Sequence, residues 1–212
     1  MLFTGLTIEN NGSDNVIEIE NETIFKTSRI IINGNNNRVT IGKALLYRDL
    51  IINFRGGNNK VFEIKPSSKN ILGVKFTSTR GDNQILTIGK NFSCGGLEIQ
   101  MNDGDENCFI GDNCLLSWGI KIRTSDGHSV VDLDTNKAIN LPQDVNVGDR
   151  VWVGEGVSFL KGSLISADSV VGSHAIVTRK FDQPNCVIAG FPAKIVKENI
   201  KWDRRMPSEY NK

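Results

Sequence analysis

Apolar residues recur every six positions over residues 147–177. The register holds Val147, Val153, Phe159, Ile165, Val171 and Val177. The position four residues after each of the first five is small or β-branched, in Val151, Val157, Ser163, Ser169 and Ala175. An amphipathic helix repeats every 3.6 residues and a half-buried strand every two, so neither element gives this pattern. A six-residue aliphatic period with small partners is typical of a parallel β-helix of hexapeptide repeats.

The first half of the chain carries a longer version of the same repeat. Five segments begin with a corner rich in Asn, Asp and Gly and close at Ile19, Ile41, Ile64, Ile88 and Ile110. The closing isoleucines are 22 to 24 residues apart, against about 18 for three hexapeptides. The excess fits a triangular coil with one enlarged corner, where Asn, Asp and Gly tolerate positive φ. A β-sandwich is the alternative, but its turns would recur about every 8–12 residues.

The spacing therefore favours an all-β fold, a parallel β-helix over residues 1–190. Its coils are irregular over 1–110 and regular over 145–180. Between them the repeat stops over about 124–144, which predicts a loop that protrudes from the coil stack. Long loops in compact domains are usually functional.

A second break follows Gly190-Phe191-Pro192. The segment Ala193–Met206 is rich in helix formers, Pro192 suits a first helical turn, and Pro207 cannot continue a helix. We expect residues 191–212 to form a C-terminal helix and tail, with the helix covering the open end of the coil stack.

Composition narrows the functional classes. A net charge of +1 argues against a general binder of nucleic acid. The sequence has neither a signal-peptide pattern at its start nor an apolar run long enough to span a membrane. The cysteines are Cys94, Cys108, Cys114 and Cys186, with no CxxC pair. We therefore expect buried free thiols, no metal site and a cytoplasmic location.

Two histidines are the candidates for acid–base chemistry. His128 lies in the predicted loop, after the run Arg123-Thr124-Ser125-Asp126-Gly127. A loop histidine beside a rigid scaffold suits a general base, because its ordinary pKa lies near working pH. His174 lies inside a regular coil, where a packed or surface role is the simpler interpretation.

Three runs of sequence carry a resemblance. Residues 147–154 read VGDRVWVG, residues 187–196 read VIAGFPAKIV, and residues 197–206 read KENIKWDRRM. The first two resemble the VGxxVWIG and AGxPAKIV motifs of bacterial hexapeptide-repeat O-acetyltransferases. The third is similar to one branch of them, the capsular polysialic acid O-acetyltransferases. The similarity is strong over about residues 110–206.

This resemblance implies a left-handed β-helix that forms a homotrimer, with acetyl-CoA bound between neighbouring subunits. A loop histidine would deprotonate an acceptor hydroxyl, which attacks the thioester. His128 matches that histidine, and Asp126 matches a residue that can hold the imidazole in the required tautomer. The implied acceptor is a sugar of a surface polysaccharide, such as a sialic acid. A backbone N–H is the expected donor to the oxyanion.

The resemblance also assigns binding residues. Trp152 would stack on pantetheine or on the sugar, and Trp118 would shape the acceptor pocket. The expected coenzyme A contacts are Ser173, Thr178, Arg179, Lys194 and Lys197. The two lysines are three residues apart and would share one face of the expected helix. Arg204 and Arg205 are weaker candidates for contact with an anionic acceptor.

Three other functions compete with this one. N-acetylation of an amino sugar, such as a nucleotide-linked one, needs the same base and donor and stays open. A γ-type carbonic anhydrase would need three histidines around zinc, and this chain has two. A β-helix that serves only as an assembly scaffold is the third, and the combination of His128, Trp152 and the closing motif argues against it.

Overall fold

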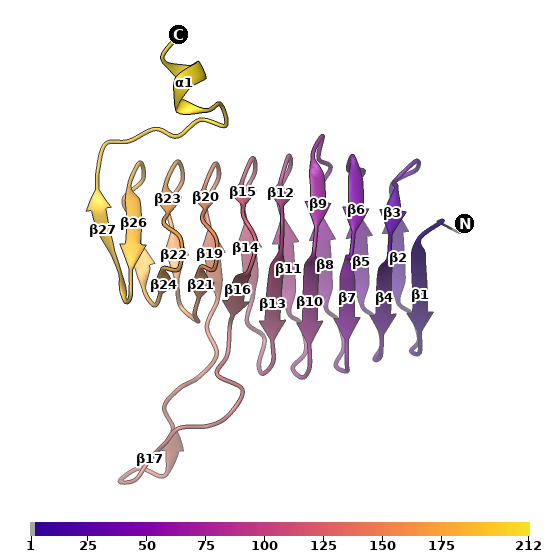
Figure 1. Ribbon diagram of the computed structural model, residues 1–212. Coiled ribbons are helices and arrows are strands. Elements are labelled where there is room, and N and C mark those ends of the chain that lie inside the picture. Colours follow the sequence, from indigo (N-terminus) through magenta and orange to yellow (C-terminus); the bar gives the residue numbers. More distant parts are fainter. Residues whose placement is uncertain (1–2) are drawn as a thin grey trace.

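The computed structural model describes residues 3–212, which form a three-sided rod of stacked coils (Figure 1). Three sheets make its sides, and each successive coil contributes one parallel strand to each sheet. The all-β parallel β-helix predicted from the repeat is confirmed. The N-terminal coils lie at one end of the rod and the regular hexapeptide coils at the other (Figure 1).

Sheet A contains β1 (Leu6–Asn10), β4 (Ser28–Ile32), β7 (Ile51–Phe54), β10 (Val74–Ser78), β13 (Leu97–Met101), β16 (Ile120–Arg123), β21 (Ser158–Phe159) and β24 (Ile176–Val177). Sheet B contains β2 (Val16–Ile19), β5 (Arg38–Ile41), β8 (Val61–Ile64), β11 (Ile85–Ile88), β14 (Cys108–Ile110), β19 (Val145–Val147), β22 (Leu164–Ile165) and β25 (Lys180–Phe181). Sheet C contains β3 (Phe25–Lys26), β6 (Leu46–Arg48), β9 (Asn70–Leu72), β12 (Ser93–Cys94), β15 (Leu115–Leu116), β20 (Trp152–Val153), β23 (Val170–Val171), β26 (Val187–Gly190) and β27 (Ala193–Lys197).

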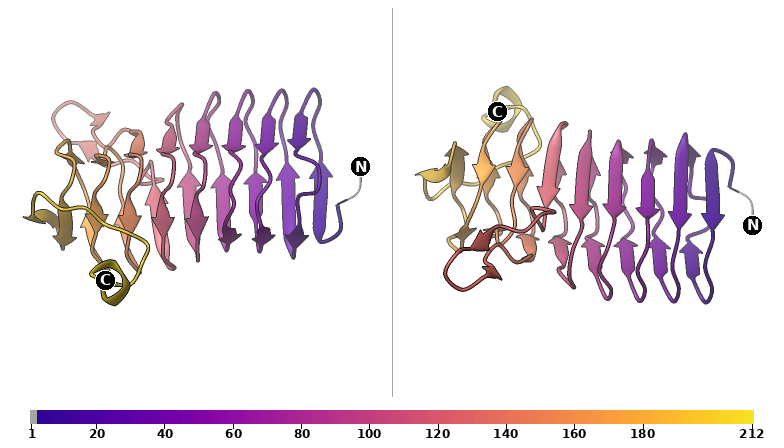
Figure 2. Two further views of the ribbon diagram at one scale, coloured as in Figure 1. Left: turned by 90° about the horizontal axis from the view of Figure 1, so that it is seen from above. Right: turned by 90° about the horizontal axis from the view of Figure 1, so that it is seen from below.

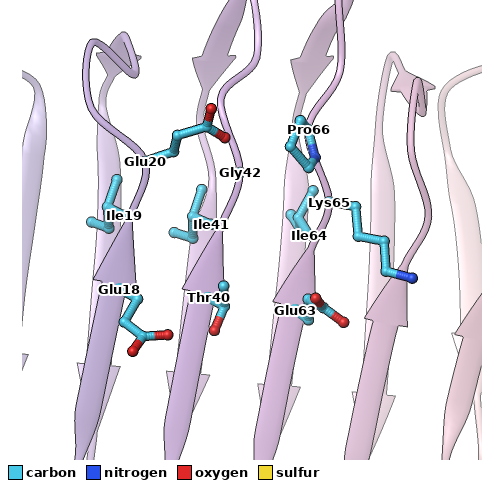
Figure 3. A pocket seen from close by; sticks show the side chains of 10 residues that line it. All are labelled: Glu18, Ile19, Glu20, Thr40, Ile41, Gly42, Glu63, Ile64, Lys65 and Pro66. Atoms are coloured by element: carbon cyan, nitrogen blue, oxygen red, sulfur yellow. The ribbon is translucent and has the colours of Figure 1, made fainter.

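The closing isoleucines stack on one another as the spacing predicts. Strand pairing places Ile19, Ile41, Ile64, Ile88 and Ile110 in one column of sheet B. Figure 3 shows three of them beside the outward-facing Glu18, Thr40 and Glu63 of the same strands. Alternation of buried and outward positions along each strand therefore builds the wall of the rod.

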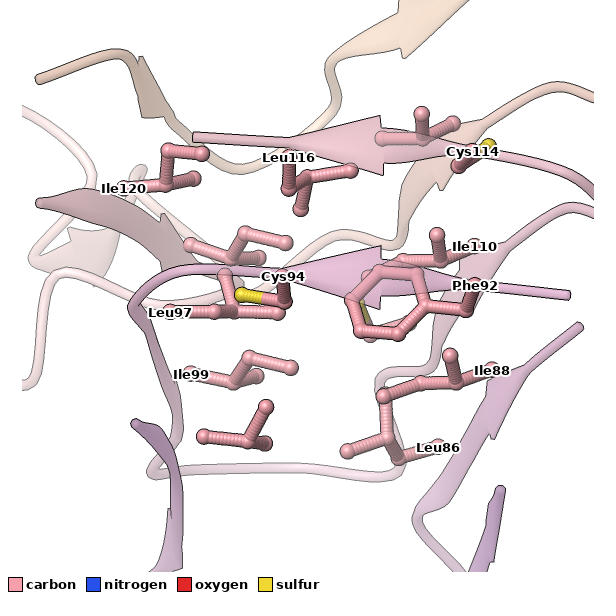
Figure 4. Close-up of a cluster of buried hydrophobic side chains, with 14 of the residues drawn as sticks. Leu86, Ile88, Phe92, Cys94, Leu97, Ile99, Ile110, Cys114, Leu116 and Ile120 are labelled. Atoms are coloured by element: carbon pink, nitrogen blue, oxygen red, sulfur yellow. The ribbon is translucent and has the colours of Figure 1, made fainter. Parts of the chain in front are cut away.

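The interior of the rod is filled by side chains from all three sheets. The six-residue register from Val147 to Val177 is buried throughout. In the middle of the rod, Leu86 and Ile88 of sheet B, Cys94 of sheet C, and Leu97 and Ile99 of sheet A converge in one cluster (Figure 4). The four cysteines are free and buried, as expected. Burial raises the pKa of the Cys94, Cys108 and Cys114 thiols to about 12.

Enlarged corners between sheets A and B explain the longer spacing of the early coils. Asn36, Asn59 and Asn83 have φ values of 55° to 61°, which asparagine tolerates better than most residues. Side-chain amides bond the corners together, since Asn58 Oδ1 accepts from the backbone N–H of Asn35 at 2.9 Å. The amide-rich corners thus add stacking contacts that a six-residue turn lacks.

The loop over 124–144 leaves the rod at this same corner, between β16 and β19, as predicted (Figure 1). It contains a small antiparallel hairpin of β17 (Val131–Asp132) and β18 (Lys137–Ala138). The regular coils resume at Val145, where β19 pairs with β14.

The C-terminal helix expected over Ala193–Met206 is wrong. Ala193–Lys197 forms β27, which pairs antiparallel with β26. Helix α1 covers only Pro207–Tyr210, so Pro207 begins a helix instead of ending one. The open edge of β26 offers a full row of unpaired backbone groups, and pairing with them outweighs local helix propensity. In residues 3–212 no helix is long and apolar enough to cross a membrane.

Candidate active site

The loop that carries His128 is held to the rod by polar contacts. Asp126 accepts hydrogen bonds from Lys161 of the next coil and, at 2.8 Å, from Asn140 Nδ2. Asn140 also donates to the carbonyl of His128 at 2.8 Å and accepts from the N–H of Val130 at 2.7 Å. Lys161 donates to the carbonyl of Asn140 at 2.8 Å. The two sides of the loop are therefore tied together next to His128.

The root of the loop is buried. Thr124 is fully buried, and its hydroxyl donates to Oε1 of buried Glu106 at 3.1 Å. The carbonyl of Thr124 accepts from the N–H of Gln143 at 2.9 Å, which closes the loop. The hydrogen bond from Lys161 is the largest cause that lowers the pKa of Asp126, and the hydrogen bond from Asn140 adds to it. This carboxylate is therefore charged at neutral pH.

His128 lies exposed at the edge of a small polar pocket of about 130 Å³. Ser125, Asn140 and the corner residues Arg80 and Asp103 also line it. Across residues 3–212 no hydrogen bond joins Asp126 to the imidazole; the Asp126 carboxylate instead holds the loop.

Trp152 and Trp118 lie together on a different side of the rod. They line one cleft of about 410 Å³ over sheet C, which Ser93 and Ser117 also line. Trp118 is 59% exposed and Trp152 is 42% exposed. Both rings are therefore accessible to a flat or apolar ligand group.

The C-terminal tail folds back over Trp152. The Trp202 ring lies 6.2 Å from the Trp152 ring, and Trp202 Nε1 donates to the carbonyl of Arg150 at 2.6 Å. Arg204 reaches two earlier coils, where it donates to Ser93 Oγ at 3.0 Å and to the carbonyl of Cys114 at 3.3 Å. A second cleft, of about 520 Å³, lies between Trp152 and this tail and includes Tyr210.

The remaining predicted residues are spread over three places. Ser173 is exposed at the corner between sheets C and A. Thr178 and Arg179 lie at the corner that also carries the loop, and the Arg179 guanidinium sits 5.0 Å from the ring centroid of Phe181. Lys194 and Lys197 are exposed on β27. The shared helix face proposed for these lysines is wrong, because the segment is a strand.

One chain does not bring all of these residues into one site. His128 and Trp152 line separate pockets without a common lining residue, and the loop and the tail leave opposite sides of the rod (Figure 2). His174 lies at a surface corner, where its imidazole packs over Gly156. The groove shown in Figure 3, about 370 Å³, contains none of the predicted residues.

Sequence reasoning missed Arg80, Asp103, Asn140 and Lys161. The sequence could have predicted Arg80 and Asp103 as site residues, because the 22–24-residue period stacks their corners directly beside the start of the loop. No comparable signal pointed to Asn140, whose role depends on how the loop closes.

A parallel β-helix with one polar loop at a corner matches the solved structures of two acetyltransferases over nearly the whole chain. The chain is 31% identical to the polySia-specific acetyltransferase NeuO, over 97% of this chain and 92% of that one, with a TM-score of 0.82. It is 32% identical to the polysialic acid O-acetyltransferase OatWY, over 97% and 96%, with a TM-score of 0.78. No protein-family model matches.

A polysialic acid O-acetyltransferase of Escherichia coli O1:K1 / APEC is 37% identical over 134 residues, 62% of this chain. That match spans 42% of the relative, so the chain covers less than half the length of this curated protein. The likeness to NeuO and OatWY extends over nearly the whole chain, and the chain belongs to the hexapeptide-repeat acetyltransferases.

Proposed function

We propose that this protein is an acetyl-CoA-dependent O-acetyltransferase that modifies a hydroxyl of a sialic acid or related sugar in a surface polysaccharide. The observation that carries the proposal is His128, exposed on a hydrogen-bonded loop at the edge of a polar pocket. The similarity to polysialic acid O-acetyltransferases supports the acceptor class. Four buried free thiols suit a reducing compartment, so we place the protein in the cytoplasm.

In the proposed reaction, the His128 imidazole takes the proton from an acceptor hydroxyl. The oxygen then attacks the thioester carbonyl, and a backbone N–H stabilises the oxyanion. The carbon–sulfur bond breaks, and the imidazolium returns its proton to the leaving thiolate. A positioned base of this kind contributes roughly 10²–10⁴-fold to the rate. Asp126 supports the base by holding the loop.

We further propose a homotrimer in which the loop of one chain faces the donor surface of its neighbour. The neighbour's donor surface would include Trp152 and Ser173, with Lys194 and Lys197 toward the phosphates and Trp118 toward the acceptor. Thr178 and Arg179 would contact coenzyme A from the chain that supplies the loop, because they lie at the same corner as the loop. The separation of His128 from Trp152 within one chain supports this arrangement. A heterologous interface that closes into a ring generates such shared sites.

The test is acetyl-CoA turnover against a panel of sialylated and neutral glycans. His128→Ala should lower kcat by roughly 10²–10⁴-fold while the oligomer and the circular dichroism spectrum stay unchanged. His174→Asn is the matched control and should keep its activity, because asparagine tolerates the positive φ of 59° at that corner.

Retained turnover in His128→Ala would contradict the mechanism. Mild alkali separates the two acyl products, since an ester is hydrolysed and an amide is not, so an alkali-stable product would indicate N-acetylation.

A further inference from the structure

The polar pocket beside His128 is built by one chain and holds charges of both signs. Arg80 and Asp103 come from the two corners that stack before the loop, and Asn140 and Ser125 come from the loop itself. The pocket of about 130 Å³ has room for about four water molecules at roughly 30 Å³ each. It can therefore receive at least one end of a sugar residue.

Arg80 is available to an anion. It is exposed, and in residues 3–212 its guanidinium makes no ion pair and donates no hydrogen bond. Two nearby cations are already engaged, since Arg123 pairs with Glu98 and Lys161 pairs with Asp126. A guanidinium presents paired N–H donors that match the two oxygens of a carboxylate.

Buried polar groups fix the backbone that carries these two residues. The ammonium of Lys60, which is 1% exposed, donates to the carbonyl of Arg80 at 3.3 Å and to that of Gly56 at 2.6 Å. Buried Glu106 accepts from the backbone N–H of Asp103 at 3.2 Å. The corners are thus held in place from inside the rod, and preorganised groups bind with a smaller loss of entropy.

We propose that this pocket is the acceptor subsite for a sugar acid. Arg80 pairs with the sugar carboxylate, and Asp103 accepts a hydrogen bond from a neighbouring sugar hydroxyl. The inference rests on the proposed function, because it assigns a substrate chemistry to the site of His128. A phosphate dianion fits less well, since Asp103 would repel its second charge.

The test compares polysialic acid with the same polymer after methyl esterification of its carboxylates. Wild-type protein should acetylate the charged polymer with the higher kcat/KM. Arg80→Gln should lower kcat/KM for the charged polymer by about 10- to 100-fold, as expected for losing a charged hydrogen-bond pair. Its kcat/KM for the esterified polymer should stay the same, and Arg80→Lys should recover part of the loss.

Arg48→Gln is the matched control, because Arg48 is an exposed arginine on sheet C; its kinetics should equal those of wild type. An Arg80→Gln variant that keeps the full preference for the charged polymer would overturn the subsite.

Binding of a sialic acid oligomer, measured by calorimetry without acetyl-CoA, separates this inference from the proposed function. If wild type binds the oligomer and Arg80→Gln binds it at least 10-fold more weakly, the result supports the subsite even if no turnover is found. Equal binding by the two proteins, or binding by neither, overturns it, whatever the turnover assays show.

Discussion

At the scale of single residues, Lys60 is the most unusual side chain in the rod. Its ammonium is buried and also donates to the hydroxyl of Ser78, which in turn bonds to Gln84. Burial lowers the pKa of Lys60 to about 8, and the carboxylates of Asp82 and Glu106 offset only part of that shift. Lys60 therefore holds the corner of Arg80 through its hydrogen bonds, while burial disfavours the charged form of its amine.

The lowered pKa predicts a pH dependence of stability. Between about pH 8 and the ordinary lysine value of 10.5, the unfolded chain binds a proton that the folded chain does not, so stability rises with pH. The free energy of unfolding of wild type should therefore increase relative to Lys60→Met, by at most about 1.4 kcal/mol per pH unit in that window. Urea denaturation at pH 7, 8.5 and 10 measures the difference.

Lys75→Met serves as the control, because Lys75 is exposed on sheet A, and its difference from wild type should not change with pH. If the difference in free energy of unfolding between wild type and Lys60→Met also stays constant with pH, Lys60 titrates like a surface lysine.

At the scale of elements, the loop over 124–144 depends on Asn140. Its side chain bonds to Asp126, to the His128 carbonyl and to the Val130 N–H. Asn140→Ala removes all three contacts but leaves the buried root at Thr124 intact. We expect faster amide hydrogen exchange over 126–141, with little change in Tm.

The same variant should lose up to about 10²-fold in kcat, the effect of misplacing a catalytic group by about 1 Å. Thr135→Ala is the control, since the Thr135 hydroxyl bonds to Asp132 at the far hairpin, away from His128. Unchanged exchange near His128 in Asn140→Ala would contradict the role given to this side chain.

The C-terminal tail gives a second prediction at this scale. Trp202 connects the tail to Arg150 and to the ring of Trp152. In a Trp118→Phe background, Trp202→Phe and Trp202→Ala each leave Trp152 as the single tryptophan. The alanine variant should show redder emission and stronger acrylamide quenching, because it uncovers the Trp152 ring.

Ser208→Ala in the Trp118→Phe, Trp202→Phe background is the control. Ser208 is exposed on α1 and is not among the residues that line the cleft between Trp152 and the tail, so emission should not shift. Equal quenching of Trp152 in the phenylalanine and alanine variants would mean that the tail does not cover it.

The elements also show which features the sequence could predict. The repeat predicted the coils, the column of isoleucines and the protruding loop, because each depends on local period and on corner residues. It failed at Ala193–Met206, where the open edge of β26 draws the chain into a strand. Edge pairing is a tertiary effect that propensity does not contain. The loop contacts of Asp126 were missed for the same reason, since Lys161 comes from a later coil.

At the scale of the whole molecule, the proposed site needs two chains. His128 of one chain and Trp152 of its neighbour would act together, so His128→Ala and Trp152→Ala damage different halves of the same site. Each variant alone should be nearly inactive. Co-expression with two affinity tags, followed by purification on both, yields assemblies that contain both variants.

In trimers that contain both variants, about one third of the interfaces would join an intact His128 to an intact Trp152. Turnover by the mixed protein should therefore rise well above that of either variant purified alone. Wild type co-expressed with the double variant and purified in the same way gives the comparison: sites between chains would leave about one sixth intact, whereas sites within one chain would leave about one half. Mixed assemblies that recover no activity would place both residues in one chain and remove the reason for a shared site.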